Sequence, residues 1–171
     1  MKDKLRKYIE SNLKVKRSFL GSVECCSYSE ERDYGFDNLV LGKYKQSNIK
    51  DFIDDNKDKY SDFQTTLFKM IDERNLKDSD VYNKVHIDRR LFSKIRSDNK
   101  YHPSKDTIIL LGLSLELSES EIEELLDSAS YSLPKNNHYD LIIRFCFINK
   151  IYKLTDVNDL LDEYGCKLFS Y

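Results

Sequence analysis

Residues 67–126 read LFKMIDERNLKDSDVYNKVHIDRRLFSKIRSDNKYHPSKDTIILLGLSLELSESEIEELL. Apolar residues in this stretch recur three or four positions apart, which is the spacing that places them on one face of an α-helix. Asn, Asp, Ser and Pro interrupt the apolar pattern repeatedly, so the pattern predicts several short helices rather than one long helix. We therefore expect a mainly α fold built around this stretch.

Three helices are predicted in the first part of this region. The first begins near Ser61 and ends before Asn75, a residue that suits a helix C-terminus. Residues 77–85 and 89–97 then form two short helices, because their apolar residues again fall on one face. The tight turn His86-Ile87-Asp88 joins these two helices.

Two more helices complete the region. Pro103 suits the first turn of a helix that continues through Leu115. Ser118 followed three residues later by Glu121 is the pattern of a capping box, in which the side chain of each residue accepts a hydrogen bond from the backbone N–H of the other. The helix that this box opens ends before Leu133-Pro134, where we expect the chain to break.

The C-terminal segment continues the helical pattern. Helices are predicted over residues 139–151 and 155–164, and Gly165 follows the second one as a C-terminal cap. We expect this segment, residues 134–171, to pack as a helical extension on a domain formed by residues 61–133.

The N-terminal segment, residues 1–60, has a different pattern. Residues 1–17 carry seven Lys or Arg against two acidic residues, and their apolar residues recur at helical spacing, so a basic amphipathic helix is expected. Short β-favouring runs at residues 22–27 and 39–41 predict a small hairpin. Residues 47–57 are expected to form a linker helix.

The composition is that of a folded protein without a membrane anchor. Hydrophobic residues make up 40% of the chain, charged residues 34%, and there are only five Gly and two Pro, which excludes collagen-like and linker-like chains. No apolar run approaches the roughly 18–20 residues that span a bilayer. The first ten residues also lack the apolar core of a signal peptide. We expect a cytoplasmic protein with no membrane partner.

The cysteines favour neither disulfides nor a metal centre. Cys25, Cys26, Cys146 and Cys166 show no CxxC spacing, and a bridge between adjacent cysteines would be strained. Zinc ligation by Cys25, Cys26 and a distant His is the alternative, although zinc sites usually contain ligand pairs at chelating spacing. We expect reduced thiols, no metal and no cofactor.

No pattern of catalytic residues occurs. The sequence contains no glycine-rich phosphate loop, no HExxH pair and no GxSxG motif. His86, His102 and His138 stand alone, and the carboxylates at residues 119–124 form one helix face without an opposing group that would separate their pKa values. We do not expect an enzyme.

Residues 63–126 resemble the helix-turn-helix domain of Cro/C1-type (XRE-like) repressors. The likeness rests on the apolar positions that fix the two central helices of that family, here Val81, Val85, Ile87, Phe92 and Ile95. Pro103-Ser104 stands where the family opens its fourth helix, with Gly112 and Leu115 following in register. The resemblance implies a five-helix unit that binds DNA, as transcription regulators do, with the helix from Arg89 in the major groove.

The resemblance also suggests a homodimer, because such proteins usually bind DNA as two-fold pairs; the helices after Tyr139 are the candidate interface. A wider likeness, from Phe63 to the C-terminus, relates the chain to helical modules appended to larger bacterial proteins. Those modules share a core like the RRLFSKIRS of residues 89–97. They imply no particular biochemical role.

The candidate nucleic-acid-binding residues lie at and after the expected recognition helix. They are Arg89, Arg90, Lys94, Arg96, Ser97, Lys100, Tyr101 and Lys105. Arg can bond a guanine edge with two hydrogen bonds, Lys can neutralise a phosphate, and the Tyr101 ring could stack on a base. Residues 89–105 contain six Lys or Arg against one Asp, whereas residues 106–127 contain seven acidic residues and no Lys or Arg.

Several features favour an alternative function. The family usually has a small residue where Tyr82 stands and Gly where His86 stands. The net charge of the chain is −2, and Asp88 adds a negative charge at the start of the recognition helix. In the alternative, the chain is a protein-interaction module with a repressor-like fold that does not read DNA, and its cationic helix engages an acidic protein partner.

Overall fold

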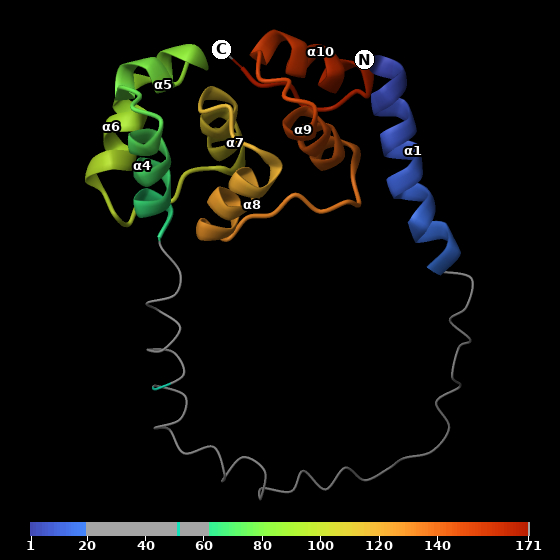
Figure 1. The fold of residues 1–171 in the computed structure, drawn as a ribbon, viewed down its shortest axis with the longest axis horizontal. Helices are drawn as coiled ribbons and strands as arrows, with labels where there is room; N and C mark the ends of the chain where they lie inside the picture. The colour runs from blue at the N-terminus through green and yellow to red at the C-terminus, as the bar shows by residue number, and fades with distance from the viewer. Residues whose placement is uncertain (20–50, 52–61, 171) are drawn as a thin grey trace, which may run out of the picture.

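The computed structural model describes residues 1–19, 51 and 62–170 (Figure 1). Every regular element in these residues is an α-helix, which confirms the mainly α fold. The helices are α1 (Lys2–Phe19), α4 (Phe63–Glu73), α5 (Asp78–Lys84), α6 (Arg89–Ser97), α7 (Lys105–Ser114), α8 (Glu119–Ser128), α9 (His138–Ile148) and α10 (Leu154–Glu163). The predicted hairpin runs at 22–27 and 39–41 lie outside the described residues, as does the predicted linker helix at 47–57 except for Asp51.

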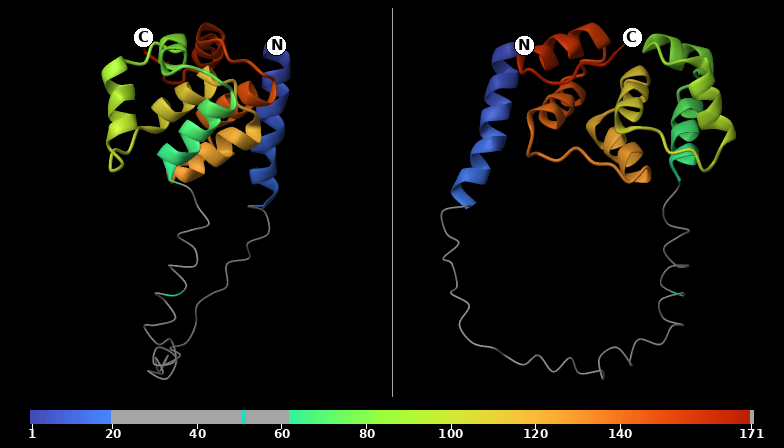
Figure 2. Two further views of the ribbon diagram at one scale, coloured as in Figure 1. Left: turned by 60° about the vertical axis from the view of Figure 1, so that its left-hand side comes forward. Right: turned by 180° about the vertical axis from the view of Figure 1, so that it is seen from behind.

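The helices form a layered body with α5 and α6 at one edge and α1 at the opposite edge (Figures 1 and 2). Helices α7, α8 and α9 lie between these edges. α4 packs against α8, α5 packs against α7, and α1 packs against α9. The first helix of the chain therefore contacts its C-terminal part.

The contact between α1 and α9 follows from the amphipathic pattern of α1. Leu5 and Ile9 are buried, and the ring of Tyr8 lies 5.7 Å from the ring of Phe145 in α9. Lys2 also forms an ion pair of 3.1 Å with Glu163 at the end of α10. The predicted amphipathic helix at the N-terminus is confirmed.

Helix α9 is the most deeply buried element of the described chain. All residues from Asp140 to Phe147 are buried. The covering helices belong to the same chain, since α1, α8 and α10 all pack against α9. The apolar side chains of α9 from Leu141 to Phe147, in a segment that the sequence suggested as a dimer interface, are therefore already used inside the chain, and only Ile148 at the end of the helix is exposed.

Six of the described helices end in the same turn, which we call the left-handed turn. In it, one residue has a positive φ, and the next residue donates its backbone N–H to a carbonyl five positions earlier, as in a Schellman motif. The residues with positive φ, after α4, α5, α7, α8, α9 and α10, are Asn75, His86, Glu116, Ser130, Lys150 and Gly165. The closing N–H···O distances lie between 2.8 and 3.3 Å.

Left-handed turns confirm two predicted helix ends and correct a third. Asn75 and Gly165 have φ values of 51° and 60°, as their sequence positions indicated. Helix α9, however, stops at Ile148 rather than Ile151, because Lys150 adopts a φ of 56° and the N–H of Ile151 bonds back to the carbonyl of Cys146. A Lys carries no sequence signal for this conformation.

Two predicted helix starts can also be compared with the structure. Ser118 and Glu121 form both hydrogen bonds of the capping box, as predicted. Pro103, in contrast, is not in the first turn of α7. Ser104 is the N-cap, its hydroxyl accepts from the backbone N–H of Thr107, and the helix begins only at Lys105.

Substitution of Ser130 by Gly should stabilise the chain. A positive φ strains any residue with a Cβ, and Gly removes that strain, although it also adds entropy to the unfolded chain. We expect a gain of about 0.5–1 kcal/mol, or a rise in Tm of about 1–4 °C, in thermal unfolding followed by circular dichroism. Ser128→Gly is the matched control. Ser128 is the last residue of α8 and its hydroxyl donates to the carbonyl of Leu125, so this variant should lose about 0.5 kcal/mol. Equal losses for both variants would contradict this account.

Glu121 should make the fold sensitive to acid. One carboxylate oxygen accepts from the N–H of Ser118 at 2.7 Å, and the other accepts from Arg74, the C-cap of α4, at 2.6 Å. The hydrogen bond from Ser118 and the Arg74 guanidinium lower the pKa of Glu121 to about 2, although partial burial opposes this shift. The stabilisation is therefore complete above the unfolded-state pKa of about 4.5 and is lost as the pH falls towards 2.

Urea unfolding between pH 7 and pH 2.5 tests this expectation. The wild type should lose stability over the acidic range, and Glu121→Gln should be less stable at pH 7 but lose less on acidification. Glu124→Gln, on the exposed side of the same helix, should follow the wild-type profile. An acid profile of Glu121→Gln that parallels the wild type would show that Glu121 does not carry this linkage.

Candidate nucleic-acid interface

Helices α5 and α6 are joined by a left-handed turn at His86. Its φ is 56°, and the N–H of Ile87 donates to the carbonyl of Tyr82 at 2.9 Å. Asp88 then caps α6 by accepting from the N–H of Arg90 at 2.6 Å. The two short helices and the tight turn between them are confirmed, and the left-handed conformation is adopted by His where the resembled family usually has Gly.

Tyr82 packs along α6 instead of projecting into solvent. Its ring is half-buried and lies 5.6 Å from the ring of Phe92, at an angle of 51°. Phe92 in turn contacts Phe68 of α4, edge to face at 6.2 Å. The bulk of Tyr82 is thus accommodated by an aromatic group that joins α4, α5 and α6.

The outward side of α6 is cationic. Phe92 and Ile95 are buried, and successive residues of an α-helix are rotated by about 100°, so the residues opposite this pair point outward. They are Arg90, Ser93, Lys94 and Ser97, with Arg89 at their edge. All five are exposed, and we call them the cationic face. In Figures 1 and 2, α6 lies at the outer edge of the molecule.

Ser93 is the member of the cationic face that was not among the predicted site residues. It lies three residues after Arg90 and four residues before Ser97, so helical spacing alone places it between them. Ser93 carries no charge, so a count of charged residues does not include it, whereas the helical spacing of residues 89–97 places it on this face.

Two further predicted site residues, Lys100 and Tyr101, follow α6 just beyond the cationic face. Lys100 is exposed in the turn after α6. The Nζ of Lys94 lies 4.3 Å from the centre of the Tyr101 ring, a cation–π distance. Tyr101 is half-buried and packs against the core. Lys94 already covers one face of its ring.

Arg96 is directed towards the neighbouring helices. Its Nη2 lies 2.6 Å from Oδ1 of Asp78 at the start of α5, and its guanidinium lies 4.2 Å from the centre of the Phe68 ring in α4. The predicted contact residue is therefore engaged by two neighbouring helices, although its side chain is 52% exposed.

Lys105 belongs to a different part of the structure. Its Nζ forms an ion pair of 2.5 Å with Asp140 of α9, and the Asp140 side chain is only 5% exposed. Asn137 also bonds to this carboxylate at 2.6 Å. Lys105 thus neutralises a buried charge between α7 and α9, and the structure does not bring it to the cationic face.

The acidic stretch at residues 106–127 is largely paired with cations from elsewhere in the chain. Asp106 pairs with Lys167 at 2.7 Å, Glu116 with Lys84 at 2.5 Å and Glu121 with Arg74 at 2.6 Å. Glu119 and Glu123 both pair with Arg144 of α9. The negative charge of this stretch is therefore used mainly to join helices.

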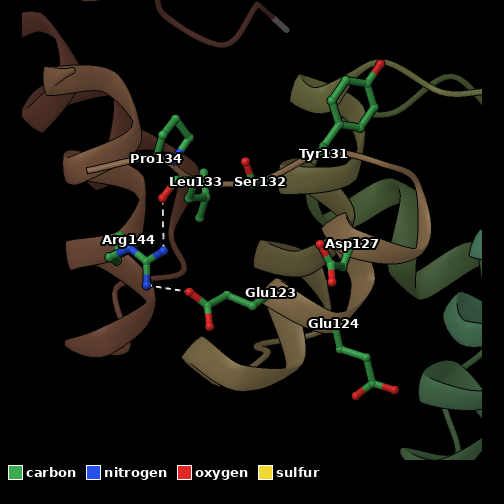
Figure 3. A pocket seen from close by; sticks show the side chains of 8 residues that line it. All are labelled: Glu123, Glu124, Asp127, Tyr131, Ser132, Leu133, Pro134 and Arg144. Atoms are coloured by element: carbon green, nitrogen blue, oxygen red, sulfur yellow. Dashed lines mark hydrogen bonds and ion pairs between the residues drawn. The ribbon is translucent and has the colours of Figure 1, made fainter. Parts of the chain in front are cut away.

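A pocket of about 300 Å³ lies between α8 and α9, next to the segment that joins them (Figure 3). Its lining residues are Glu123, Glu124, Asp127, Tyr131, Ser132, Leu133, Pro134 and Arg144. The Arg144 side chain is only 10% exposed; it bonds to Glu119 at 2.7 Å, to Glu123 at 2.5 Å and to the carbonyl of Leu133 at 2.9 Å. Its charge is balanced by the two carboxylates, although its buried Nε–H has no hydrogen-bond partner among the described residues.

The described residues contain no arrangement that suggests chemistry at a metal or a thiol. No group of three or more His, Cys, Asp or Glu among them is placed to hold a metal ion. Burial raises the pKa of the Cys146 thiol to about 12, which keeps it protonated and unreactive at neutral pH. Within the same residues, no helix has the length and apolar character needed to cross a membrane.

Comparison of the chain with protein-family models, with curated proteins and with solved structures found no match.

Proposed function

We propose that this chain is a DNA-binding protein, acting as a transcription regulator, that inserts α6 into the major groove. The observation that carries the proposal is the division of α6 into two sides. Phe92 and Ile95 anchor one side in the core, and Arg89, Arg90 and Lys94 project from the other. A helix of this kind at the edge of a protein has the dimensions and charge that a major groove accepts.

Each part of the cationic face has a suited role in this proposal. Arg89 and Arg90 stand in the first turn of α6, where a guanidinium can bond to the O6 and N7 atoms of guanine. Lys94, with Lys100 beside it, supplies positive charge for backbone phosphates. Ser93 and Ser97 lie between these cations and can donate or accept hydrogen bonds at base edges.

The proposal concerns contact by the α6 surface and does not require dimerisation through α9. The apolar side chains of α9 from Leu141 to Phe147 are buried within the chain, so a two-fold complex on DNA would need another surface.

A second candidate function is recognition of an acidic protein surface by the same face. Two observations favour it: the net charge of the chain is −2, and the carboxylate of Asp88 stands at the N-terminus of α6. A negative charge at that position repels a phosphate approaching the first turn, whereas a protein carboxylate can be placed to avoid it.

Retention on pooled genomic DNA fragments at several salt concentrations tests the first proposal. The wild type should bind at low salt and dissociate as salt rises, because neutralised phosphates release counterions. Arg89→Ala/Arg90→Ala/Lys94→Ala should weaken binding by at least about tenfold, since each good base contact contributes about 1–3 kcal/mol. Its salt dependence should also be shallower, by roughly 0.9 in logarithmic slope for each phosphate that the variant no longer neutralises.

The matched control is Lys4→Ala/Lys135→Ala/Lys153→Ala, which removes the same charge from exposed positions outside α4–α8. It should bind nearly as the wild type does. No retention of the wild type even at low salt would rule out DNA binding. Retention on immobilised acidic peptide in that case, abolished in the α6 variant, would favour the second candidate.

A further inference from the structure

Helix α6 lacks the left-handed turn that closes the helices around it. After α6, Asp98 has a φ of −118°, and its N–H bonds to the carbonyl of Lys94. Helices α4, α5, α7, α8, α9 and α10 all end instead with a positive-φ residue and a bond back to the preceding turn. The C-terminal end of α6 therefore has to be held by other groups.

Those groups come from α4 and α5. The side-chain amide of Gln64 in α4 donates a hydrogen bond to the carbonyl of Ile95, near the C-terminus of α6. Arg96 stacks on Phe68 of α4 and pairs with Asp78 of α5. Neighbouring residues of the last turn of α6 are thus fixed to two different helices.

The apolar contacts of α6 alone are few. The helix has nine residues, of which only Phe92 and Ile95 are fully buried. Leu91 adds a partly buried contact with the core. A short helix with so few anchoring side chains can still tilt or rotate, and a recognition surface needs its side chains fixed to within a fraction of an ångström. Polar contacts at one end can supply that restraint even where each contributes little to overall stability.

We propose that Asp78 and Arg96 form an ion pair that sets the orientation of α6, so that Arg96 is a positioning residue and does not contact the DNA. This inference rests on the proposed function for its role in DNA binding. Its structural part, the restraint of α6 by Asp78, stands independently of DNA. Arg suits the role better than Lys, because its planar guanidinium can stack on Phe68 while it donates to a carboxylate.

The Asp78→Asn variant distinguishes a positioning role from a purely electrostatic one, because the two predict opposite changes in DNA affinity. Asp78→Asn removes a negative charge close to the cationic face, and by charge alone this should strengthen binding to a polyanion. If Asp78 positions α6 through Arg96, the same change should weaken binding, because α6 becomes less well oriented.

The experiment uses the full chain in four forms: wild type, Asp78→Asn, Asp80→Asn and Arg96→Lys. Asp80 is the matched control, since it is an exposed acidic residue in the same first turn of α5 and its carboxylate accepts from Ser79 of that helix. Two readouts are needed: affinity for the genomic DNA fragments, and hydrogen–deuterium exchange of the backbone amides of α6.

We expect Asp78→Asn and Arg96→Lys to bind DNA about three- to tenfold more weakly than the wild type, a change equivalent to the free energy of roughly one exposed ion pair or cation–π interaction. The amides of α6 should exchange faster in both variants. Asp80→Asn should bind DNA as tightly as the wild type or slightly more tightly, with unchanged exchange in α6.

Either of two results would overturn the inference. One is tighter DNA binding by Asp78→Asn, equal to that of Asp80→Asn; the other is unchanged exchange of α6 in Asp78→Asn. If the wild type does not bind DNA, the proposed function fails, and faster exchange of α6 in Asp78→Asn alone would still support the positioning role of the ion pair.

Discussion

The left-handed turn is the constraint on which the packing of this chain depends. The residue after each positive-φ position donates its N–H backwards, and this places its side chain against the helix that has just ended. Ile87, Leu117 and Ile151 occupy that place after α5, α7 and α9, and all three are buried. Each of these three turns therefore ends a helix and adds an apolar side chain to the core, whereas Leu76, in the same place after α4, is exposed. Only one of the six positive-φ residues in the described chain is a glycine. The backbone strain at residues such as Glu116 and Lys150 is offset by burial of the next side chain, Leu117 or Ile151.

This constraint explains which parts of the fold could be predicted from the sequence. Prediction succeeded where local chemistry decides the structure. Ser118 and Glu121 form their capping box, and Asn75 and Gly165 take the left-handed conformation that Asn tolerates and that Gly, without a Cβ, adopts freely. Prediction failed where packing decides. The residue type Lys does not predict that a turn at Lys150 ends α9. The turn forms there because the side chain of Ile151 becomes buried in the core. The packing of α1 on α9 is also absent from the sequence pattern, because the two helices are far apart along the chain.

The candidate site shows the same division between local and long-range information. Helical spacing placed Arg89, Arg90 and Lys94 together, and the structure keeps all three exposed on α6. The spacing could not show that Arg96 would meet Asp78 and Phe68, or that Lys105 would neutralise a buried Asp140 in α9. A count of charges along the sequence therefore included Arg96 and Lys105 among the candidate DNA-binding residues, because it contains no information about partners on other helices. Ser93 was overlooked for the converse reason, as it carries no charge.

A net charge of −2 is a weak argument against a polyanionic partner once these pairs are known. Five of the seven acidic residues between 106 and 127 lie in ion pairs with Lys or Arg from other parts of the chain. A charge pair acts at a distance as a dipole, and in physiological salt even an isolated surface charge is screened beyond roughly 8–10 Å. A ligand that approaches α6 therefore responds mainly to the charges near that helix. There, Arg89, Arg90, Lys94 and Lys100 form no ion pair among the described residues, and Asp78 is already neutralised by Arg96. These four cations outnumber the carboxylates of Asp88 and Asp98 at the two ends of α6. The local sign at α6 is positive even though the chain as a whole is acidic.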